Sequence, residues 1–200
     1  MHERPAAVPP WKLAPNQHVI RDYVFAPILV PADDPLYAQA AALADLPLRI
    51  VVRDDWLALA VYAAPGATRH CLLLNDEYGW TAGGGGASGG GPELPLRAAV
   101  GGSWTTPISN PKSFAAVTIE GTAAADITRI HIEFDDGHVE ESAASHGAFA
   151  WFYARRPAPQ RPPEGDAFTR EVLGAEPLRV IGRTADGREV ARQEMRLSAN

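Results

Sequence analysis

The chain has 200 residues, of which 46% are hydrophobic and 21% are charged. This composition allows one large domain with a buried core and excludes a largely disordered chain. The formal net charge of −6 argues against nucleic acid and against an anionic membrane surface as general partners. The single cysteine, Cys71, excludes an internal disulfide bond.

The apolar runs and the turn residues limit both the cellular location of the protein and its class of fold. No apolar run approaches the roughly 20 residues of a membrane-spanning helix, and the start, MHERPAAVPPWK, lacks the apolar segment of a secretory signal. We therefore expect no membrane insertion and a cytoplasmic protein, or an extracytoplasmic one if the sequence has been trimmed. Glycine and proline contribute 18 residues each, above the roughly 12% of an average protein, and this favours short strands and turns.

The N-terminal residues 1–16 are rich in proline. They predict an extended arm, in which Trp11 and Leu13 serve as anchors either to the body of the chain or to a partner. Residues 17–200 predict a single β-sandwich domain.

One short helix and a meander of strands open this domain. Asp34 can cap a helix, Pro35 suits its first position, and Pro47 ends it. The segments Leu48–Val52 and Trp56–Tyr62 then predict two strands. Because the second is apolar on both faces, we expect it to be central and covered on both sides.

Residues 81–91 read TAGGGGASGGG, the most unusual stretch of the chain. A run of glycines loses much conformational entropy on ordering and has few side chains to bury, so it predicts a mobile surface loop or linker. A phosphate-binding loop is disfavoured, because neither a lysine nor a helix start follows the run.

Two Asp-Gly hairpins dominate the C-terminal half. The segment Ile127–Ser142 alternates apolar and polar residues around Asp136-Gly137, which predicts a two-residue turn with Val139 starting a return strand of the same in-and-out pattern. Leu178–Met195 repeats this design around Asp186-Gly187, fifty positions later. The two copies predict neighbouring or facing ribbons, although any two Asp-Gly hairpins look alike.

Between the hairpins lies an aromatic strand, Ala148–Ala154, followed by a proline-rich loop over residues 155–165 and a possible helical turn over Asp166–Leu173. Together these elements predict a mainly β fold. We expect an antiparallel β-sandwich, immunoglobulin-like or jelly-roll-like, with one short helix and the N-terminal arm.

The first hairpin carries candidates for a metal site, namely His131, Asp135 and His138. A two-residue turn places Asp135 opposite His138 and Glu133 opposite Glu140, and imidazole with carboxylates on one face can hold a divalent ion. The same row of polar groups is also what the solvated face of any sheet presents, and this second interpretation is favoured.

Motifs for catalysis are missing from the sequence. His146 lies near Ser142 and Ser145, but no Gly-x-Ser-x-Gly elbow occurs, and the glycine run does not match a dinucleotide fingerprint. We therefore predict no catalytic residue and no cofactor.

Tryptophan, tyrosine and arginine residues outside the most regular strands favour protein binding, because these types are enriched at interface hot spots. The predicted partner-binding set is Trp11, Leu13, Trp80, Trp104, Tyr153, Arg155 and Arg156.

The order of features resembles a known group of domains. It is carried by WLALAVY at residues 56–62, Cys71-Leu72, the glycine run, the hairpin ITRIHIEFDDGHV, the aromatic strand at 149–153, and LRVIGRTADGREVAR at 178–192. These features, over about residues 48–197, are similar to uncharacterised β-sandwich domains of high-GC Gram-positive (actinobacterial) bacteria, often tethered outside the membrane. The resemblance implies a sandwich fold and transfers no catalytic residue.

Two classes of function follow. The first is a non-catalytic protein-interaction or assembly domain, an accessory subunit that binds a protein partner or itself. The alternative is a β-sandwich that binds a small molecule, a metal or a carbohydrate, with Trp80 or Trp104 as a sugar platform, or an enzyme that uses the face of His131 and His138.

Overall fold

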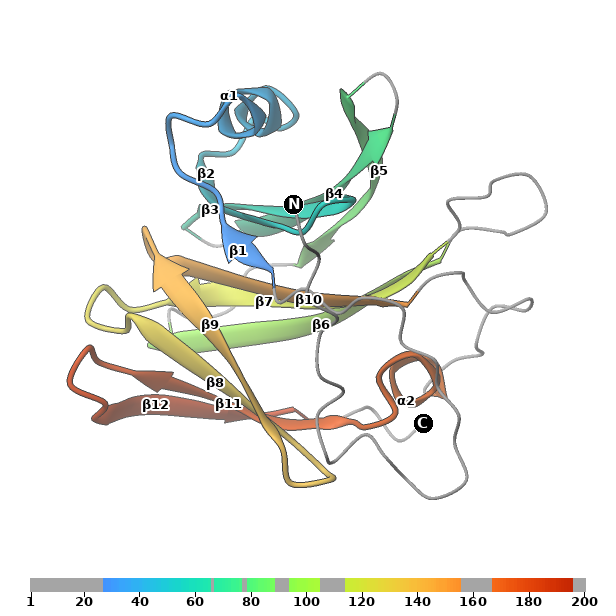
Figure 1. The fold of residues 1–200 in the computed structure, drawn as a ribbon. Helices are drawn as coiled ribbons and strands as arrows, with labels where there is room; N and C mark the ends of the chain where they lie inside the picture. Colours follow the sequence, from blue (N-terminus) through green and yellow to red (C-terminus); the bar gives the residue numbers. More distant parts are fainter. Residues whose placement is uncertain are drawn as a thin grey trace, which may run out of the picture.

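The computed structural model describes residues 27–195 except 66, 77–78, 89–93, 105–113 and 156–166. The described elements are mostly strands (Figure 1). In chain order they are β1 (Ile28–Leu29), α1 (Pro35–Ala41), β2 (Leu48–Arg53), β3 (Leu57–Ala64), β4 (Ala67–Asp76), β5 (Gly79–Ser88), β6 (Leu96–Trp104), β7 (Ala115–Ala123), β8 (Arg129–Phe134), β9 (Val139–Ser145), β10 (Ala148–Arg155), α2 (Ala167–Leu173), β11 (Pro177–Arg183) and β12 (Glu189–Glu194).

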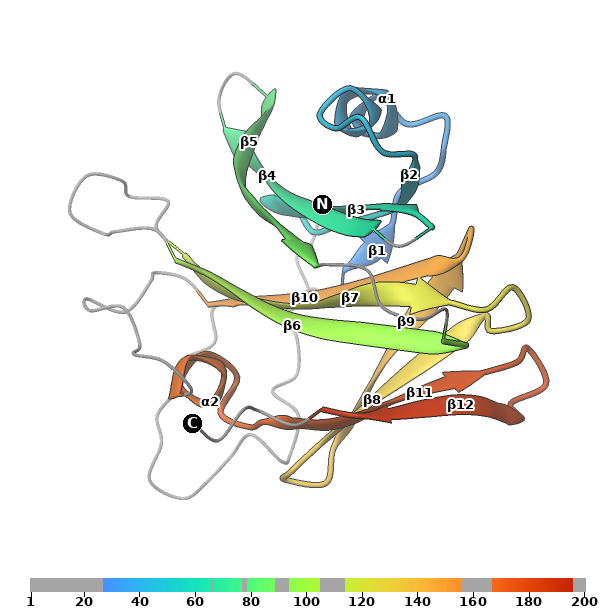
Figure 2. The same ribbon diagram turned by 180° about the vertical axis from the view of Figure 1, so that it is seen from behind.

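The strands form two antiparallel sheets. One is an open sheet of five strands in the order β1-β2-β3-β4-β5, and the other has seven strands in the order β12-β11-β8-β9-β10-β7-β6. The seven-stranded sheet curls until its two edge strands, β6 and β12, approach each other (Figure 2). We call it the barrel sheet.

The side chain of Gln193 joins the two edges of the barrel sheet. Its Nε2 donates a hydrogen bond to the carbonyl oxygen of Ala98 at 2.9 Å, and its Oε1 accepts one from the amide nitrogen of Ala98 at 2.7 Å. The carboxamide therefore takes the place of a neighbouring strand's peptide group, and it satisfies backbone groups that the edge of β6 leaves open.

Three apolar layers hold the fold together. The first fills the barrel sheet, the second lies between the open sheet and strands β7 and β10, and the third lies between the open sheet and α1. Figure 1 shows this stacking, with α1 above the open sheet and α2 at one end of the barrel sheet. Strand β3 is buried on both faces, as predicted, because it lies between the second and third layers.

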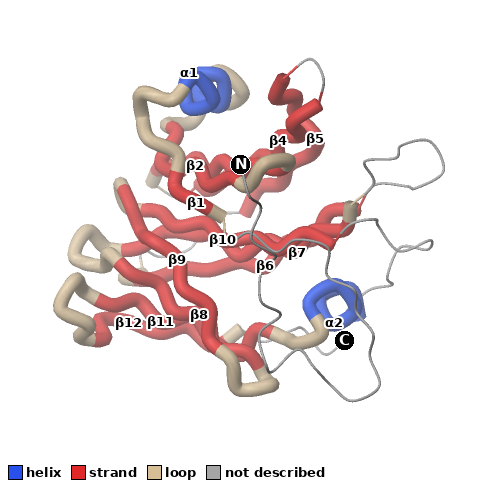
Figure 3. The backbone as a smooth tube through the Cα atoms, viewed as in Figure 1, coloured by secondary structure: helices blue, strands red, loops and turns tan. Residues whose placement is uncertain are grey.

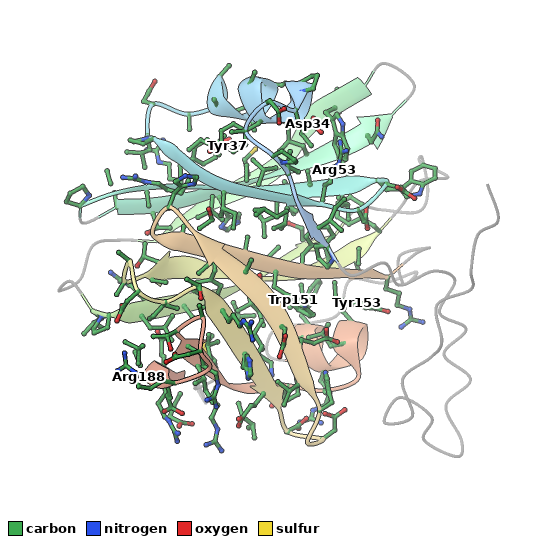
Figure 4. All side chains as sticks on the ribbon, turned by 60° about the vertical axis from the view of Figure 1, so that its left-hand side comes forward. Asp34, Tyr37, Arg53, Trp151, Tyr153 and Arg188 are labelled. Atoms are coloured by element: carbon green, nitrogen blue, oxygen red, sulfur yellow. The ribbon has the colours of Figure 1, made fainter. Side chains whose placement is uncertain are left out.

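Helix α1 forms where the capping residues predicted it. Asp34 adopts an extended conformation and accepts a hydrogen bond from the amide of Leu36 at 2.8 Å, and Pro35 takes the first position. Asp34 also pairs with Arg53 of β2 at 3.2 Å, which ties the start of the helix to the open sheet (Figure 4). Helix α2 is a second helix, at the place where a helical turn was expected.

Both Asp-Gly hairpins form, but their turns differ from the prediction. Phe134 pairs with His138 through a hydrogen bond from the Phe134 amide to the His138 carbonyl, so the loop has three residues, ending in Gly137 at a φ of +86°. The prediction of a two-residue turn was wrong. Gly137 occupies a left-handed position that makes a three-residue loop with a bulge favourable.

The longer loop reverses the faces of the return strand, because a shift of one residue moves every side chain to the other side. Val139 is therefore exposed and pairs with Glu133, where Glu140 had been expected. The second hairpin has the same three-residue loop, and β11 pairs with β8. The two ribbons are thus neighbours, as their similarity predicted.

The glycine run is a strand over most of its length, and the prediction of a loop was wrong there. Residues 79–88 form β5, which pairs with β4 along the edge of the open sheet (Figure 3). Residues 89–91 lie outside the described part of the chain. The backbone hydrogen bonds of the β4–β5 ladder order the glycines without any contribution from side chains.

The prediction of a mainly β, antiparallel fold is confirmed. The predicted arm over residues 1–16 lies outside the described residues, and so do residues 156–165 of the predicted proline-rich loop. Within the described ranges, no helix is long and apolar enough to span a bilayer.

Candidate functional site

A histidine–glutamate pair lies in the layer between the two sheets. On β4, His70 and Leu72 face the barrel sheet while Leu73 faces α1, as the period of two requires. On β7, Thr118 and Glu120 face the open sheet, because their neighbour Ile119 points into the barrel core. The crossing of these strands brings together two polar residues that are fifty positions apart in the chain.

The pair is short and largely protected from solvent. Nδ1 of His70 lies 2.8 Å from Oε1 of Glu120, and the side chains are 19% and 5% exposed respectively. The hydrogen bond to Glu120 raises the pKa of His70 above its usual value; burial opposes this shift and the negative charge of Glu120 adds to it. The protonated imidazole is therefore stabilised by Glu120.

Two polar atoms beside the pair have no hydrogen-bond partner among the described residues. They are Oε2 of Glu120 and Oγ1 of Thr118, and both side chains are buried. Buried polar groups are normally satisfied by protein or by ordered water. A carboxylate oxygen, a hydroxyl group and an imidazole in one place can bind a water molecule or exchange a proton with it.

Glycines from two other strands frame the imidazole. A Cβ atom at Gly86 of β5 would lie 2.7 Å from Cε1 of His70, and one at Gly85 would lie 2.6 Å from its carbonyl oxygen. A Cβ at Gly101 of β6 would lie 2.6 Å from Oγ1 of Thr118. Part of the glycine run is thus explained by the space that the ring and backbone of His70 occupy.

A cleft of about 570 Å³ opens between the ends of the two sheets. Thr68 and Thr122 line it, and each lies two residues before or after a member of the His70–Glu120 pair on the same face of its strand. The remaining lining residues are Arg49, Ala63, Ala64, Pro65, Ala67, Leu94, Pro95, Arg97, Ala123, Ala124, His146 and Gly147.

The predicted metal candidates each have a different neighbour. His131 lies 3.1 Å from Glu141, Asp135 pairs with Arg170 at 2.6 Å, and His138 bonds to Asp136.

His138 is also stacked on Phe134, with ring centroids 4.2 Å apart. In the described part of the chain no group of three or more His, Cys, Asp or Glu side chains is placed to hold a metal ion.

The serine residues near His146 divide between two roles. Oγ of Ser142 donates to the carbonyl oxygen of Ala150 at 2.8 Å, and Oγ of Ser145 lies 3.1 Å from Nδ1 of His146. The second contact joins adjacent residues in the exposed β9–β10 turn. Neither arrangement places a hydroxyl group next to the His70–Glu120 pair.

The predicted partner-binding residues are scattered through the fold. Tyr153 is buried in the barrel core next to Trp151 and offers no docking surface (Figure 4), because the inward face of β10 fills the barrel. Trp80 is partly buried against the layer beneath α1. Nη1 of Arg155 donates to the carbonyl oxygen of Glu171 at 3.4 Å.

Four further members of that set lie outside the description. Trp11, Leu13 and Arg156 are outside the described residues, and for Trp104 only the backbone is described, paired with Ala115.

An uncharged edge strand is the other prominent feature. Strand β5 is the last strand of the open sheet, and residues 81–87 are all exposed. It contains neither a charged residue nor proline. At the opposite edge, β1 is only two residues long.

Sequence reasoning missed His70, Thr118 and Glu120. A usable signal existed in the segment FAAVTIEGTA, because a threonine and a glutamate at alternate positions of an otherwise apolar strand predict one polar row on a buried strand. The partner on β4 had no such signal. The resemblance to actinobacterial sandwich domains stays a prediction: no protein-family model, no curated protein and no solved structure matches the chain.

Proposed function

We propose that the chain is a non-catalytic interaction domain that pairs with a second copy of itself along the outer edge of β5. One observation carries the proposal: a ten-residue strand ends the open sheet, and no strand of the described residues pairs with its outer side.

Edge strands expose unpaired N–H and C=O groups that invite another strand. Natural proteins protect such edges with lysine, proline, short strands or bulges. Strand β5 has neither lysine nor proline. Its one bulge lies opposite Leu72 and Leu73, and the segments 79–82 and 84–88 on either side of the bulge pair regularly with β4. Strand β1, at the opposite edge, is by contrast protected because it is only two residues long.

A second copy is the occupant that charge favours. The chain carries a net charge of −6, which opposes self-association through most surfaces. Two β5 strands placed antiparallel across a twofold axis bring only uncharged residues together, so no like charges meet. The glycines also allow close approach of the two backbones.

Light scattering after size exclusion tests the proposal. We expect a concentration-dependent mass that rises from 21.4 kDa towards twice that value. Ala82→Lys, at an exposed position of β5, should weaken the dimer about tenfold or more, ~1.4 kcal/mol. Ala125→Lys, with the same charge change in an exposed turn, should leave the mass unchanged.

A second variant introduces a negative charge, and it tests whether the weakening of the dimer depends on the sign of the introduced charge. Ala87→Glu lies opposite Arg69, so it favours the pairing of β4 with β5 inside one chain, yet it should also weaken the dimer. A wild-type mass of 21.4 kDa at all concentrations, or variants that dimerise as well as Ala125→Lys, would refute self-pairing through β5.

Two finer predictions belong to this proposal. Removal of residues 1–16, with Trp11 and Leu13, tests whether the arm adds to the contact; an unchanged dimer would remove the arm from the proposal. The sandwich type is supported by the packing of β2 and β3 against β10 through a shared apolar layer.

A further inference from the structure

The cleft between the ends of the two sheets has a cationic lining. Arg49 comes from β2, Arg97 from β6 and His146 from the β9–β10 turn, so three separate elements contribute a basic side chain. None of the described residues that line it is an aspartate or a glutamate. In a chain with six more acidic than basic residues, this described lining has the opposite balance.

The size and the remaining lining suit a small organic molecule. About 570 Å³ lies within the roughly 300–1,000 Å³ of small-molecule sites. Apart from the three basic residues and the two threonines, Thr68 and Thr122, the described lining residues are alanine, proline, leucine and glycine. A bound molecule would therefore meet charge at a few points and apolar surface elsewhere.

Arg49 is held in place at the cleft. Its Nε donates a hydrogen bond to the carbonyl oxygen of Ala63 at 2.9 Å, and both residues line the cleft. Among the described residues no carboxylate forms an ion pair with Arg49. A guanidinium group that is fixed through Nε keeps its terminal N–H groups as donors for an oxyanion.

His146 adds an independent indication of a site. Its φ of +51° makes it the one non-glycine residue in the left-handed region within the described ranges. Asparagine or glycine would adopt this conformation more readily than histidine, and strained positions of this kind cluster at binding sites. The turn thereby holds an imidazole at the rim of the cleft.

We propose that this cleft binds a small organic acid, with its carboxylate held by Arg49 and Arg97 and its apolar body against the alanine and proline residues. Guanidinium groups match the two oxygens of a carboxylate, which favours an acid over a neutral molecule. The apolar lining favours an organic body over an inorganic anion. No residue of β5 is among the described residues that line the cleft, and the proposal does not depend on self-association.

Benzoate is the probe, with benzamide as its uncharged analogue and inorganic phosphate as a bare anion. In two-dimensional amide NMR spectra of the full chain, we expect saturable shifts with benzoate at Thr68, Thr122 and Gly147. Benzamide should bind at least about tenfold more weakly, because it lacks the charge. Phosphate should not displace benzoate at equal concentration.

Substitutions locate the contact. Arg49→Gln should weaken benzoate binding about tenfold or more, and Arg97→Gln should do the same if the first variant fails to fold. Arg188→Gln, which alters an exposed arginine in the β11–β12 turn, serves as the matched control and should leave binding unchanged. Equal binding of benzoate and benzamide, displacement by phosphate, no saturable binding, or binding that survives both cleft substitutions would each overturn the proposal.

Discussion

Replacing Gln193 with methionine should weaken the seam of the barrel sheet, which is the contact between its edge strands β6 and β12. Methionine has nearly the same length as glutamine but cannot replace the two hydrogen bonds, of 2.7 and 2.9 Å, that join Gln193 to Ala98. Each such bond contributes about 0.5–1.5 kcal/mol net, so both together contribute about 1–3 kcal/mol to the free energy of unfolding. That is a large share of the roughly 5–15 kcal/mol of a typical domain.

Urea unfolding of wild-type protein and variant measures this difference. We expect a lower midpoint with an unchanged slope, since the surface exposed on unfolding stays the same. The amide proton of Ala98 should also exchange faster with solvent, because its acceptor is Oε1 of Gln193.

The matched control is Gln39→Met. The Gln39 side chain is exposed and donates one hydrogen bond, to the carbonyl oxygen of Trp80. A Gln193→Met variant within about 0.5 kcal/mol of wild type, or no less stable than Gln39→Met, would show that the seam is not held by this carboxamide.

Three further predictions follow from the layer between the sheets and the strands beside it. Because Glu120 raises the pKa of His70, the stabilisation by this pair is complete below about pH 6.5 and is lost as the pH rises through the higher pKa of the folded state. Glu120→Gln should therefore cost most at low pH in unfolding experiments. Gly121→Ala should cost more than about 3 kcal/mol or prevent folding, because its Cβ would overlap the backbone of Arg97. Burial raises the pKa of Cys71, so iodoacetamide should alkylate this thiol slowly.

Each of these three predictions has its own control. His131→Gln removes one partner of a contact at 3.1 Å with Glu141, whose side chain is 66% exposed. Because solvent screens such a contact, this variant should lower the free energy of unfolding less than Glu120→Gln does. A Cβ atom at Gly187 would meet no atom within 4 Å, but this residue has a φ of +89°. Gly187→Ala should therefore lower the free energy of unfolding by about 1 kcal/mol through backbone strain alone, without the steric overlap expected at Gly121. Alkylation of Cys71 as fast in the folded protein as in urea would contradict the burial argument.

The apolar strands were predictable because burial leaves a period of two in the sequence. The segments around Ile130 and Trp151 follow it, and the structure places them as strands with the expected inward faces. Helix α1 was predictable from its cap at Asp34. Turn length was not, since an Asp-Gly pair suits both two-residue and three-residue loops, and that ambiguity misplaced Val139.

The glycine strand and the contact between His70 and Glu120 were beyond sequence reasoning for different reasons. Glycine has no side chain with which to show a period, so only pairing with β4 reveals β5 as a strand. His70 and Glu120 belong to different sheets, and their contact depends on how those sheets cross. Local patterns carry no information about such a crossing.

The irregularity in the pairing of β5 with β4 can occupy more than one position along the strand. Leu72 pairs with Gly84 and Leu73 with Ala82, so Gly83 is the extra residue of a bulge. Residues 83–86 are identical, and moving the bulge along them exchanges one glycine for another without moving any side chain from one face to the other. Only the glycines change their partners on β4 when the bulge moves, while Ala82 and Ala87 on either side keep theirs. The outer edge of β5 can therefore place its bulge at more than one position opposite a strand that pairs with it.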